Sequence, residues 1–445
     1  MPKATYHFPR GFLWGTASAA HQVEGDNLNN QWWAWEQAGH TAATSGRAAD
    51  WWAGRWQEDF DRAAASGQNA QRISVEWSRI QPAPNRWDED ALERYREMLR
   101  GLHQRGLSPM VTLHHFTDPI WLTEIGSWET QAVIPLFEKF VRKTIQALKD
   151  FCSLWCTINE PSAYALNGYV AGGLSGDWPP GKNNLKLAMQ VQANMLRAHV
   201  AAYHAIHQIQ PEARVGAAMH YRSLVPHHKW SPLDKLLTKN ASNLINDGFP
   251  MALSKGYIRT ALGTQRIPEA IGTQDYFGFN YYTRNQVTFD VRKPNAFFSH
   301  GFHPQDADLS DSGFLANEPD GFYEGLKRVV RMFPNLPILV TENGFADAQD
   351  RVRPRYIAQH IHQMWRAVNF NWPIQGYFHW TLVDNFEWDH GWTQRFGLWA
   401  LDPETQIRTK RPSADLYVDI CKENGLSSEM VQKYCPEVFE KLFPS

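Results

Sequence analysis

The sequence predicts a single (β/α)8 TIM barrel, an α/β fold whose active site lies at the C-terminal ends of the strands. Short apolar runs typical of buried parallel strands recur eight times along the 445 residues, and longer amphipathic stretches separate them. This alternation indicates βαβ units and a parallel sheet. No linker rich in Pro, Gly or Ser divides the units, so one closed barrel is favoured over two doubly wound domains.

The predicted strands are short, and each ends close to polar residues. In chain order they span residues 12–16, 70–74, 110–115, 154–160, 215–220, 276–281, 338–342 and 376–380. Residues 88–105 predict a helix, because they open with acidic residues and carry Leu92, Tyr95, Leu99 and Leu102 at helical spacing. Residues 133–148 show the same pattern.

Two regions depart from the alternation. Residues 284–320 are polar, contain Gly and Pro and show little periodicity, so a long loop is expected after the sixth strand. Residues 411–445 predict one or two peripheral helices that end near Phe443. The whole chain, residues 1–445, is expected to form one catalytic domain.

Composition and charge limit the kinds of molecule that the protein is expected to bind. The net charge of -2 gives no electrostatic reason to expect nucleic acid or an anionic membrane, and no apolar run reaches the length of a membrane span. A small neutral substrate is expected. The N-terminus lacks the apolar core of a secretory signal and four cysteines are too few for a disulfide scaffold, so a cytoplasmic location with buried free thiols is expected. The twenty tryptophans favour a carbohydrate ligand only modestly, since most tryptophans belong to cores.

Polar side chains gather at the C-terminal ends of the predicted strands, where barrel enzymes keep their active sites. These residues are Arg72, His114, His115, Asn159, Glu160, Asn280, Tyr282, Glu342, Asn343 and Trp380. Any one of them could simply cap a strand. Six strand ends that direct polar groups to one mouth indicate a site instead.

Two carboxylates predict the chemistry. Glu160 ends the fourth strand and Glu342 the seventh, so the two can flank one bond from opposite sides. Cleavage of a glycosidic bond with retention uses such a pair, about 5–5.5 Å apart, with one nucleophile and one general acid/base. Arg72 and Tyr282 are expected to hold Glu342 ionised, which would push Glu160 toward its protonated form, and Asn159 is placed to bind the sugar 2-hydroxyl. The alternative from these residues alone is a structural ion pair with an arginine.

Several motifs resemble one known family in order along the chain. They are Phe12-Leu13-Trp14-Gly15, Gln22-Val23-Glu24-Gly25, the run from Arg72 to Ile80, Asn159-Glu160-Pro161, Asn280-Tyr281-Tyr282, Thr341-Glu342-Asn343-Gly344 and Asp384-Asn385-Phe386-Glu387-Trp388. From about Phe8 to Tyr417 the chain resembles the β-glucosidases of glycoside hydrolase family 1.

The resemblance implies a retaining β-glycosidase that removes terminal non-reducing β-glucosyl residues, and also β-galactosyl or β-fucosyl residues. Glu160 would be the acid/base and Glu342 the nucleophile. The implied partners are small-molecule β-glycosides or short oligosaccharides, as in cellulose degradation, with no cofactor and no metal, in a monomer or homo-oligomer. Arg72, Asn159 and Tyr282 would support catalysis. The implied substrate-binding residues are Gln22, His115, Asn159, Asn280, Tyr282, Trp380, Glu387, Trp388 and Phe396.

The chain also departs from the family pattern. Residues 26–35 are richer in Asn and Trp than is common, and Ala316-Asn317-Glu318 replaces a frequent Trp-Glu-Ile before Pro319. The aglycone side of the site is therefore not predicted. The serine, lysine and tyrosine set of the 6-phospho-glycosidases is absent from the last barrel loop, so a phosphorylated glycone is not expected.

Three alternatives remain open at this point. A non-catalytic sugar-binding barrel would retain Trp380 and Gln22 but needs no carboxylate pair. A metal-dependent barrel hydrolase is suggested by His114, His115 and His220, which all end strands. A transglycosidase would differ only in its acceptor.

Overall fold

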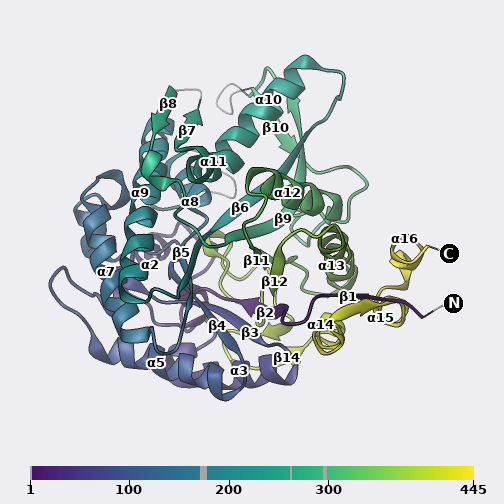
Figure 1. Ribbon diagram of the computed structural model, residues 1–445, viewed down its shortest axis with the longest axis horizontal. Helices are drawn as coiled ribbons and strands as arrows, with labels where there is room; N and C mark the ends of the chain where they lie inside the picture. The colour runs from purple at the N-terminus through teal and green to yellow at the C-terminus, as the bar shows by residue number, and fades with distance from the viewer. Residues whose placement is uncertain (1–2, 171–177, 261–262, 294–297, 445) are drawn as a thin grey trace.

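Eight parallel strands close into a barrel in the computed structural model, which describes residues 3–170, 178–260, 263–293 and 298–444. Each strand pairs with the next, and the last pairs with the first, which confirms the predicted fold (Figure 1). The barrel strands are β2 (Leu13–Ala17), β3 (Ala70–Ser74), β4 (Ser108–His114), β5 (Leu154–Asn159), β6 (Arg214–Pro226), β9 (Phe277–Phe289), β11 (Ile338–Asn343) and β12 (Ile374–His379).

Long amphipathic helices surround the barrel and cover the outer faces of its strands (Figure 1). They are α3 (Trp56–Ala65), α5 (Glu89–Gln104), α7 (Val133–Leu148), α9 (Leu185–Ile209), α10 (Pro232–Ser242), α11 (Gly248–Lys255), α12 (Pro319–Met332) and α13 (Arg353–Asn369). Both helices predicted from periodicity are confirmed. The first of these, α5, begins where the Asp88 side chain accepts a hydrogen bond from the backbone N–H of Ala91, which is a helix cap.

Shorter helices lie in the loops above the barrel. They are α1 (Ala20–Val23), α2 (Gln31–Gln37), α4 (Trp77–Ile80), α6 (Ile120–Glu124) and α8 (Pro161–Tyr169). Two antiparallel hairpins, β7 (Tyr257–Thr260) with β8 (Gly263–Arg266) and β13 (Trp399–Leu401) with β14 (Arg408–Lys410), complete these loops.

The region after the sixth barrel strand is not the loop that its composition suggested. Strand β9 continues to Phe289 and turns back into β10 (Ser299–Phe302), which pairs with it antiparallel, while β6 runs alongside as far as Pro226. The prediction was wrong because both strands extend beyond the barrel. There they are half exposed, and polar residues replace the apolar run that marks a buried strand. A loop prediction holds for residues between β10 and α12.

The C-terminal segment packs beside the N-terminus. The sequence predicted one or two helices there, and the described part of the segment has three, α14 (Pro412–Glu423), α15 (Ser428–Tyr434) and α16 (Phe439–Leu442). Between them lies an unpredicted strand, β15 (Gly425–Ser427), which pairs antiparallel with β1 (Thr5–His7). Figure 1 shows both termini on this side of the molecule.

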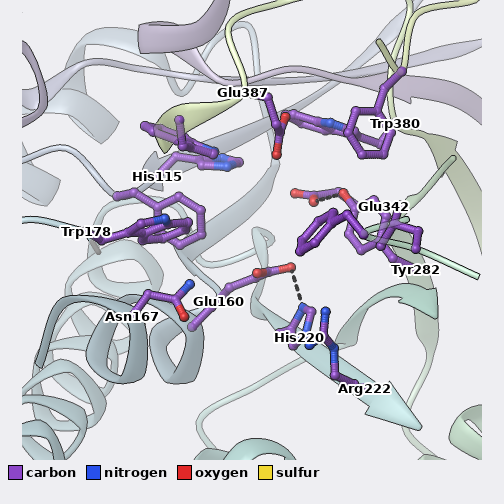
Figure 2. Close-up of a pocket in the computed structure, with 16 residues that line it drawn as sticks. His115, Glu160, Asn167, Trp178, His220, Arg222, Tyr282, Glu342, Trp380 and Glu387 are labelled. Carbon is purple, nitrogen blue, oxygen red and sulfur yellow. Dashed lines mark hydrogen bonds and ion pairs between the residues drawn. The ribbon is translucent and has the colours of Figure 1, made fainter. Parts of the chain in front are cut away.

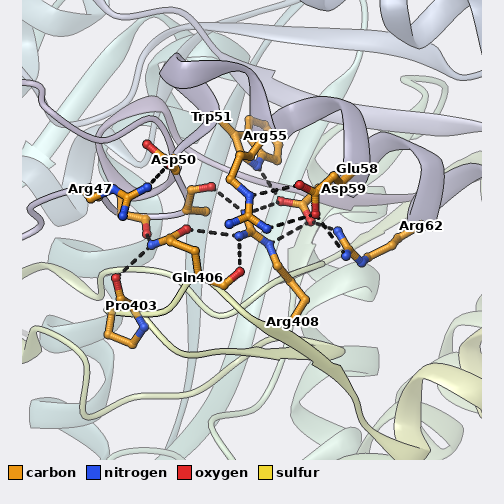
Figure 3. Close-up of polar contacts among 12 residues, drawn as sticks. Arg47, Asp50, Trp51, Arg55, Glu58, Asp59, Arg62, Pro403, Gln406 and Arg408 are labelled. Atoms are coloured by element: carbon orange, nitrogen blue, oxygen red, sulfur yellow. Dashed lines mark hydrogen bonds and ion pairs between the residues drawn. The ribbon is translucent and has the colours of Figure 1, made fainter.

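A buried ion pair fastens the hairpin β13–β14 to helix α3. The guanidinium of Arg408 lies 3.1 Å from a carboxylate oxygen of Asp59, and both side chains have no exposed surface (Figure 3). Asp59 also accepts from the indole N–H of Trp51 at 2.8 Å and from Arg62 at 2.7 Å. Arg408 further donates to the carbonyls of Ala49 and Gln406, so both charges are fully hydrogen-bonded.

Tryptophans make a large contribution to the core. Five of them, Trp14, Trp32, Trp77, Trp128 and Trp155, rank among the largest fully buried side chains. All four cysteines are buried free thiols, as the sequence indicated. None of the helices within the described ranges is long and apolar enough to cross a membrane.

Candidate active site

A pocket of about 610 Å³ opens at the C-terminal ends of the barrel strands. Side chains from six barrel strands or the loops that follow them point into it (Figure 2). It is lined by His115, Phe116, Glu160, Ala163, Asn167, Trp178, His220, Arg222, Tyr282, Phe314, Leu315, Glu342, Trp380, Glu387, Trp388 and Phe396.

Glu342 is held by two short hydrogen bonds. Its Oε1 accepts from Arg72 Nη1 at 2.5 Å, and its Oε2 accepts from the Tyr282 hydroxyl at 2.6 Å. Arg72 is itself fixed by Asn159 Oδ1 at 2.7 Å and by Thr112 Oγ1 at 3.1 Å. Burial, together with the charge of Glu342, raises the pKa of Tyr282 well above its usual value, so this phenol remains a donor. The carboxylate therefore presents a fixed edge to the pocket.

Glu160 stands at the junction of β5 and α8 with a left-handed backbone, φ 44° and ψ 58°. For a residue other than glycine this conformation costs about 1–3 kcal/mol, and it concentrates at functional sites. Pro161 follows as the first residue of α8, and a residue before proline disfavours the right-handed helical region. The Oε1 atom of Glu160 accepts from Asn280 Nδ2 at 2.8 Å and lies 3.2 Å from His220 Nδ1.

The ionisation of this pair differs from the sequence-based expectation. Burial raises the pKa of Glu342 to about 7, because the charge of Glu160 adds to the effect of burial and Arg72 and Tyr282 offset it only in part. Burial acts on Glu160 too, but the charge and hydrogen bond of His220, with Asn280 and Arg72, outweigh it and lower the pKa of Glu160. The expected order is thus reversed, since His220 was not placed beside Glu160. Together the two carboxyls hold one proton up to about pH 7, because a second ionisation would set two negative charges side by side.

Glu387, Trp380 and Trp388 form the opposite wall of the pocket from Glu160. Burial, with the charges of Asp389 and Glu342, raises the pKa of Glu387 to about 8. The Glu387 Oε2 atom accepts from Gln22 Nε2 at 3.3 Å. The His115 ring is stacked near both indoles, with centroids 6.0 Å from Trp380 and 6.1 Å from Trp388. This wall combines ring faces with fixed hydrogen-bonding groups.

Close backbone packing sets the position of Trp380. Gly344 follows Glu342 and Asn343, and a Cβ on it would lie 1.9 Å from the Trp380 carbonyl oxygen. Only glycine fits at this contact. The glycine of the Thr-Glu-Asn-Gly motif therefore brings the segment that carries Glu342 against the one that carries Trp380.

The predicted site residues divide into two groups. Glu160, Glu342, His115, Tyr282, Trp380, Glu387, Trp388 and Phe396 line the pocket. Gln22, Arg72, Asn159 and Asn280 lie directly behind it and hydrogen-bond to lining residues or to one another. Of this second group, Gln22 has a buried Oε1 atom without a hydrogen-bond partner.

Sequence reasoning missed the outer part of the pocket. His220 was noticed only as a strand end, whereas Phe116, Asn167, Trp178, Arg222 and Phe314 were not selected. Strand alternation could have indicated Arg222, because it lies two residues after His220 and so shares its face of β6. The remaining residues come from loops and from α8, where periodicity gives no signal.

The histidines considered as metal ligands do not converge. His114 Nε2 lies 2.9 Å from Asp118 Oδ1 in a closed network with Ser127 and Trp128. His115 contacts Asn159, and His220 contacts Glu160. Within the described ranges, no group of three or more His, Cys, Asp or Glu side chains could hold a metal ion.

Comparison with known proteins identifies the family. Residues 4–426 match the sequence model of glycosyl hydrolase family 1. The chain belongs to this family. It is a retaining β-glycosidase, the activity of family 1, on a (β/α)8 barrel.

Named glycosidases align with nearly the whole chain. It is 29% identical to β-glucosidase A of Thermotoga maritima over 94% of this chain and 98% of that protein. It is 30% identical to a β-galactosidase of Sulfolobus acidocaldarius over 95% and 96% of the two chains. Among solved structures, a β-glycosidase from Pyrococcus horikoshii has 34% identity and a TM-score of 0.88, covering 97% of this chain and 98% of that one. A family 1 β-glucosidase from Thermotoga maritima in complex with isofagomine lactam also has a TM-score of 0.88, with 28% identity.

Proposed function

We propose that the protein hydrolyses terminal β-D-glucosyl residues, and also β-galactosyl or β-fucosyl residues, with Glu342 as nucleophile and Glu160 as general acid/base. The observation that carries this assignment is the contrast between two carboxyls that face one pocket. Glu342 is fixed by Arg72 and Tyr282, whereas the Glu160 carboxyl contacts the neutral Asn280 amide and His220 among the described residues.

In the first step, an oxygen of Glu342 bonds to the anomeric carbon as the bond to the leaving oxygen breaks. The proton of the carboxyl pair moves from Glu160 to that oxygen, and the aglycone leaves as an alcohol or phenol. This step needs the proton on Glu160. A glycosidic oxygen beside Glu160 favours that placement, since it can accept a hydrogen bond only from the protonated carboxyl.

In the second step, Glu160 accepts a proton from water while the water oxygen attacks the anomeric carbon and releases Glu342. Esterification removes the charge of Glu342, so the pKa of Glu160 is set without an anionic neighbour and the residue acts as a base. The tetrahedral configuration at the anomeric carbon is inverted twice. The product therefore keeps the β configuration.

The wall opposite Glu160 supports a sugar in the glycone position. We propose that Trp380 covers one face of the ring and that Glu387, Gln22, His115 and Trp388 bind hydroxyls, with Asn159 at the 2-hydroxyl. Glu387 is neutral below about pH 8 in its buried position and can then both donate and accept. The unpartnered Oε1 of Gln22 is an acceptor suited to a hydroxyl.

The relatives support the substrate class and a place in the breakdown of β-linked glucans. Two of them carry the names β-glucosidase A and 1,4-β-D-glucan glucohydrolase. We further propose that residues 1–445 act as one catalytic domain, with 411–445 peripheral, and that the protein acts in the cytoplasm.

Two variants test the assignment of roles. Glu342→Ala should lower kcat by about 10⁴-fold or more on every glycoside, since no covalent intermediate can form. Glu160→Ala should lower kcat/KM by about 10²–10⁴-fold on methyl β-glucoside but far less on 2,4-dinitrophenyl β-glucoside, whose leaving group needs no proton. Equal losses on both substrates would show that Glu160 is not the acid.

A further inference from the structure

Two nitrogen-bearing side chains on β6 face the pocket but do not react in the steps above. His220 and Arg222 are two residues apart, so they project from the same face of the strand, and both line the pocket beneath Glu160 (Figure 2). Tyr221, between them, packs the other way against Phe279. The strand thus delivers two nitrogen-rich groups to one part of the pocket.

Arg222 has no carboxylate partner among the residues that the structure describes. None of the ion pairs involves it, and its buried Nε atom has no hydrogen-bond partner. The guanidinium carbon lies 5.9 Å from the centre of the Phe314 ring. Unpaired guanidinium groups in partly apolar surroundings are costly, so a positive charge held here indicates a negatively charged ligand.

The backbone of Arg222 is rigidly placed. Its N–H donates to Asn246 Oδ1 and its carbonyl accepts from Asn246 Nδ2, both at 2.9 Å. These bonds fix the point at which the Arg222 side chain leaves the strand.

The described side chains that line the pocket, together with Arg72 behind it, leave a positive excess. Arg72 and Arg222 contribute two guanidinium charges, whereas the carboxyl pair carries one negative charge while it shares a proton. Below about pH 8 Glu387 is mostly neutral, because burial and its acidic neighbours raise its pKa. Within this set one guanidinium charge is not balanced, and Arg222 is the group that forms no ion pair with a described residue.

We propose that Arg222, assisted by His220, forms a subsite that binds a carboxylate on the aglycone of the substrate. Figure 2 places both residues on the far side of Glu160 from Glu387 and Trp380, which is the side of the leaving group if the proposed function holds. The planar guanidinium matches a carboxylate with two parallel hydrogen bonds. Phe314 and Leu315 line the same pocket and suit an aromatic ring, so the preferred substrates are β-glucosides of carboxylated phenols.

Two glucosides of similar size and shape test the subsite. They are 4-carboxyphenyl and 4-carbamoylphenyl β-D-glucoside, which differ in charge at the far end of the ring. The quantity to compare is the ratio of their kcat/KM values in the wild type, in Arg222→Gln and in Arg222→Lys. Arg292→Gln is the matched control, because Arg292 has 85% of its side chain exposed and lies outside the pocket.

Arg222→Gln is expected to lower the ratio of acidic over neutral glucoside by about tenfold or more, and Arg222→Lys by less, because lysine keeps the charge but not the planar fork. Arg292→Gln should keep the wild-type ratio. A ratio that changes less than twofold in Arg222→Gln overturns the proposal.

Calorimetry separates this proposal from the proposed function. The wild type should bind free 4-hydroxybenzoate more tightly than 4-hydroxybenzamide, and Arg222→Gln should lose that preference. Equal binding of the two compounds by the wild type refutes the subsite. If neither glucoside is hydrolysed, the proposed function fails, and the calorimetric preference alone then decides for or against the anion subsite.

Discussion

Single residues around the carboxyl pair determine where its one proton lies. Arg72 and Tyr282 stabilise charge on Glu342, while His220 and Asn280 stabilise charge on Glu160. The charge of Glu160 raises the pKa of Glu342, so the two carboxyls titrate as a coupled pair that shares one proton. The reactive state is the one in which the shared proton faces the leaving oxygen.

The pH dependence of turnover follows from this shared proton. Above about pH 7 the pair loses it, since the pKa of the more basic carboxyl is raised to about 7. For methyl β-glucoside, kcat/KM should then fall, approaching tenfold per pH unit. For 2,4-dinitrophenyl β-glucoside the fall should be much weaker, because that substrate needs no acid. Profiles recorded from pH 4 to 9 would contradict this account if both substrates showed the same alkaline limb.

The sequence identified those residues whose type is dictated by the reaction. Glu160, Glu342, Arg72 and Tyr282 lie at or near the ends of the predicted strands, and such ends can be recognised from apolar runs. His220 ends a predicted strand too, but its contact with Glu160 depends on how two neighbouring strands align. This register cannot be read from composition, so the ionisation order was predicted wrongly.

At the scale of elements, the loop after the last barrel strand is held in place by a residue from the C-terminal segment. Asp384, in this loop, accepts from Arg411 Nη1 at 2.8 Å and Nη2 at 2.9 Å, and from the Gly397 N–H at 2.8 Å. Arg411 immediately precedes helix α14. The C-terminal segment thus anchors the loop that carries Glu387 and Trp388.

Breaking this anchor should affect both stability and substrate binding. Asp384 has 1% and Arg411 8% of its side chain exposed, so Arg411→Met leaves a buried carboxylate with the more distant Arg395, 3.8 Å away, as its charged partner. We expect a loss of about 3–5 kcal/mol in the free energy of unfolding. KM for aryl β-glucosides should rise as well, since Glu387 is no longer held in place.

The neighbouring residue offers a control for urea denaturation. Lys410 pairs with Asp415 at the surface, so Lys410→Met should change stability by less than about 0.5 kcal/mol. Similar losses of unfolding free energy in the two variants would mean that the Arg411–Asp384 ion pair stabilises the fold no more than a surface pair does.

Elements that the sequence did not predict share one physical property. Strands β10 and β15 have four and three residues. Strand β10 pairs with the outer end of β9, and β15 pairs with β1 at the other end of the chain. Such strands take their stability from hydrogen bonds to a partner and not from a continuous apolar run. The barrel strands and the helices α5 and α7 were found because each buries a whole face, which leaves a periodic signal.

At the scale of the molecule, the fold buries several acidic side chains, and the effect of this burial on the free energy of unfolding depends on pH. Glu387 has a pKa raised to about 8 in the folded protein. In the unfolded chain a glutamate titrates near its ordinary value. Folding therefore favours the neutral form. Its contribution to the free energy of unfolding is fully present below the pKa of the unfolded chain and is lost as pH rises through about 8.

Glu387→Gln should remove this pH dependence. Between pH 5 and 8, the free energy of unfolding of the wild type should fall relative to the variant by roughly 3 kcal/mol. Urea denaturation of both proteins at the two pH values measures the difference. Glu93→Gln is the control, since Glu93 is exposed and pairs with Arg96 at the surface. A pH dependence equal in wild type and Glu387→Gln would show that Glu387 is not held neutral by the fold.

The central claim is double displacement through Glu342, and the configuration of the first product tests it most directly. Proton NMR of the protein hydrolysing an aryl β-glucoside resolves the two anomers of glucose before they interconvert. The account predicts that β-glucose forms first and that the α anomer follows only by mutarotation. Initial α-glucose would contradict it, because inversion requires water, and not Glu342, to attack the anomeric carbon.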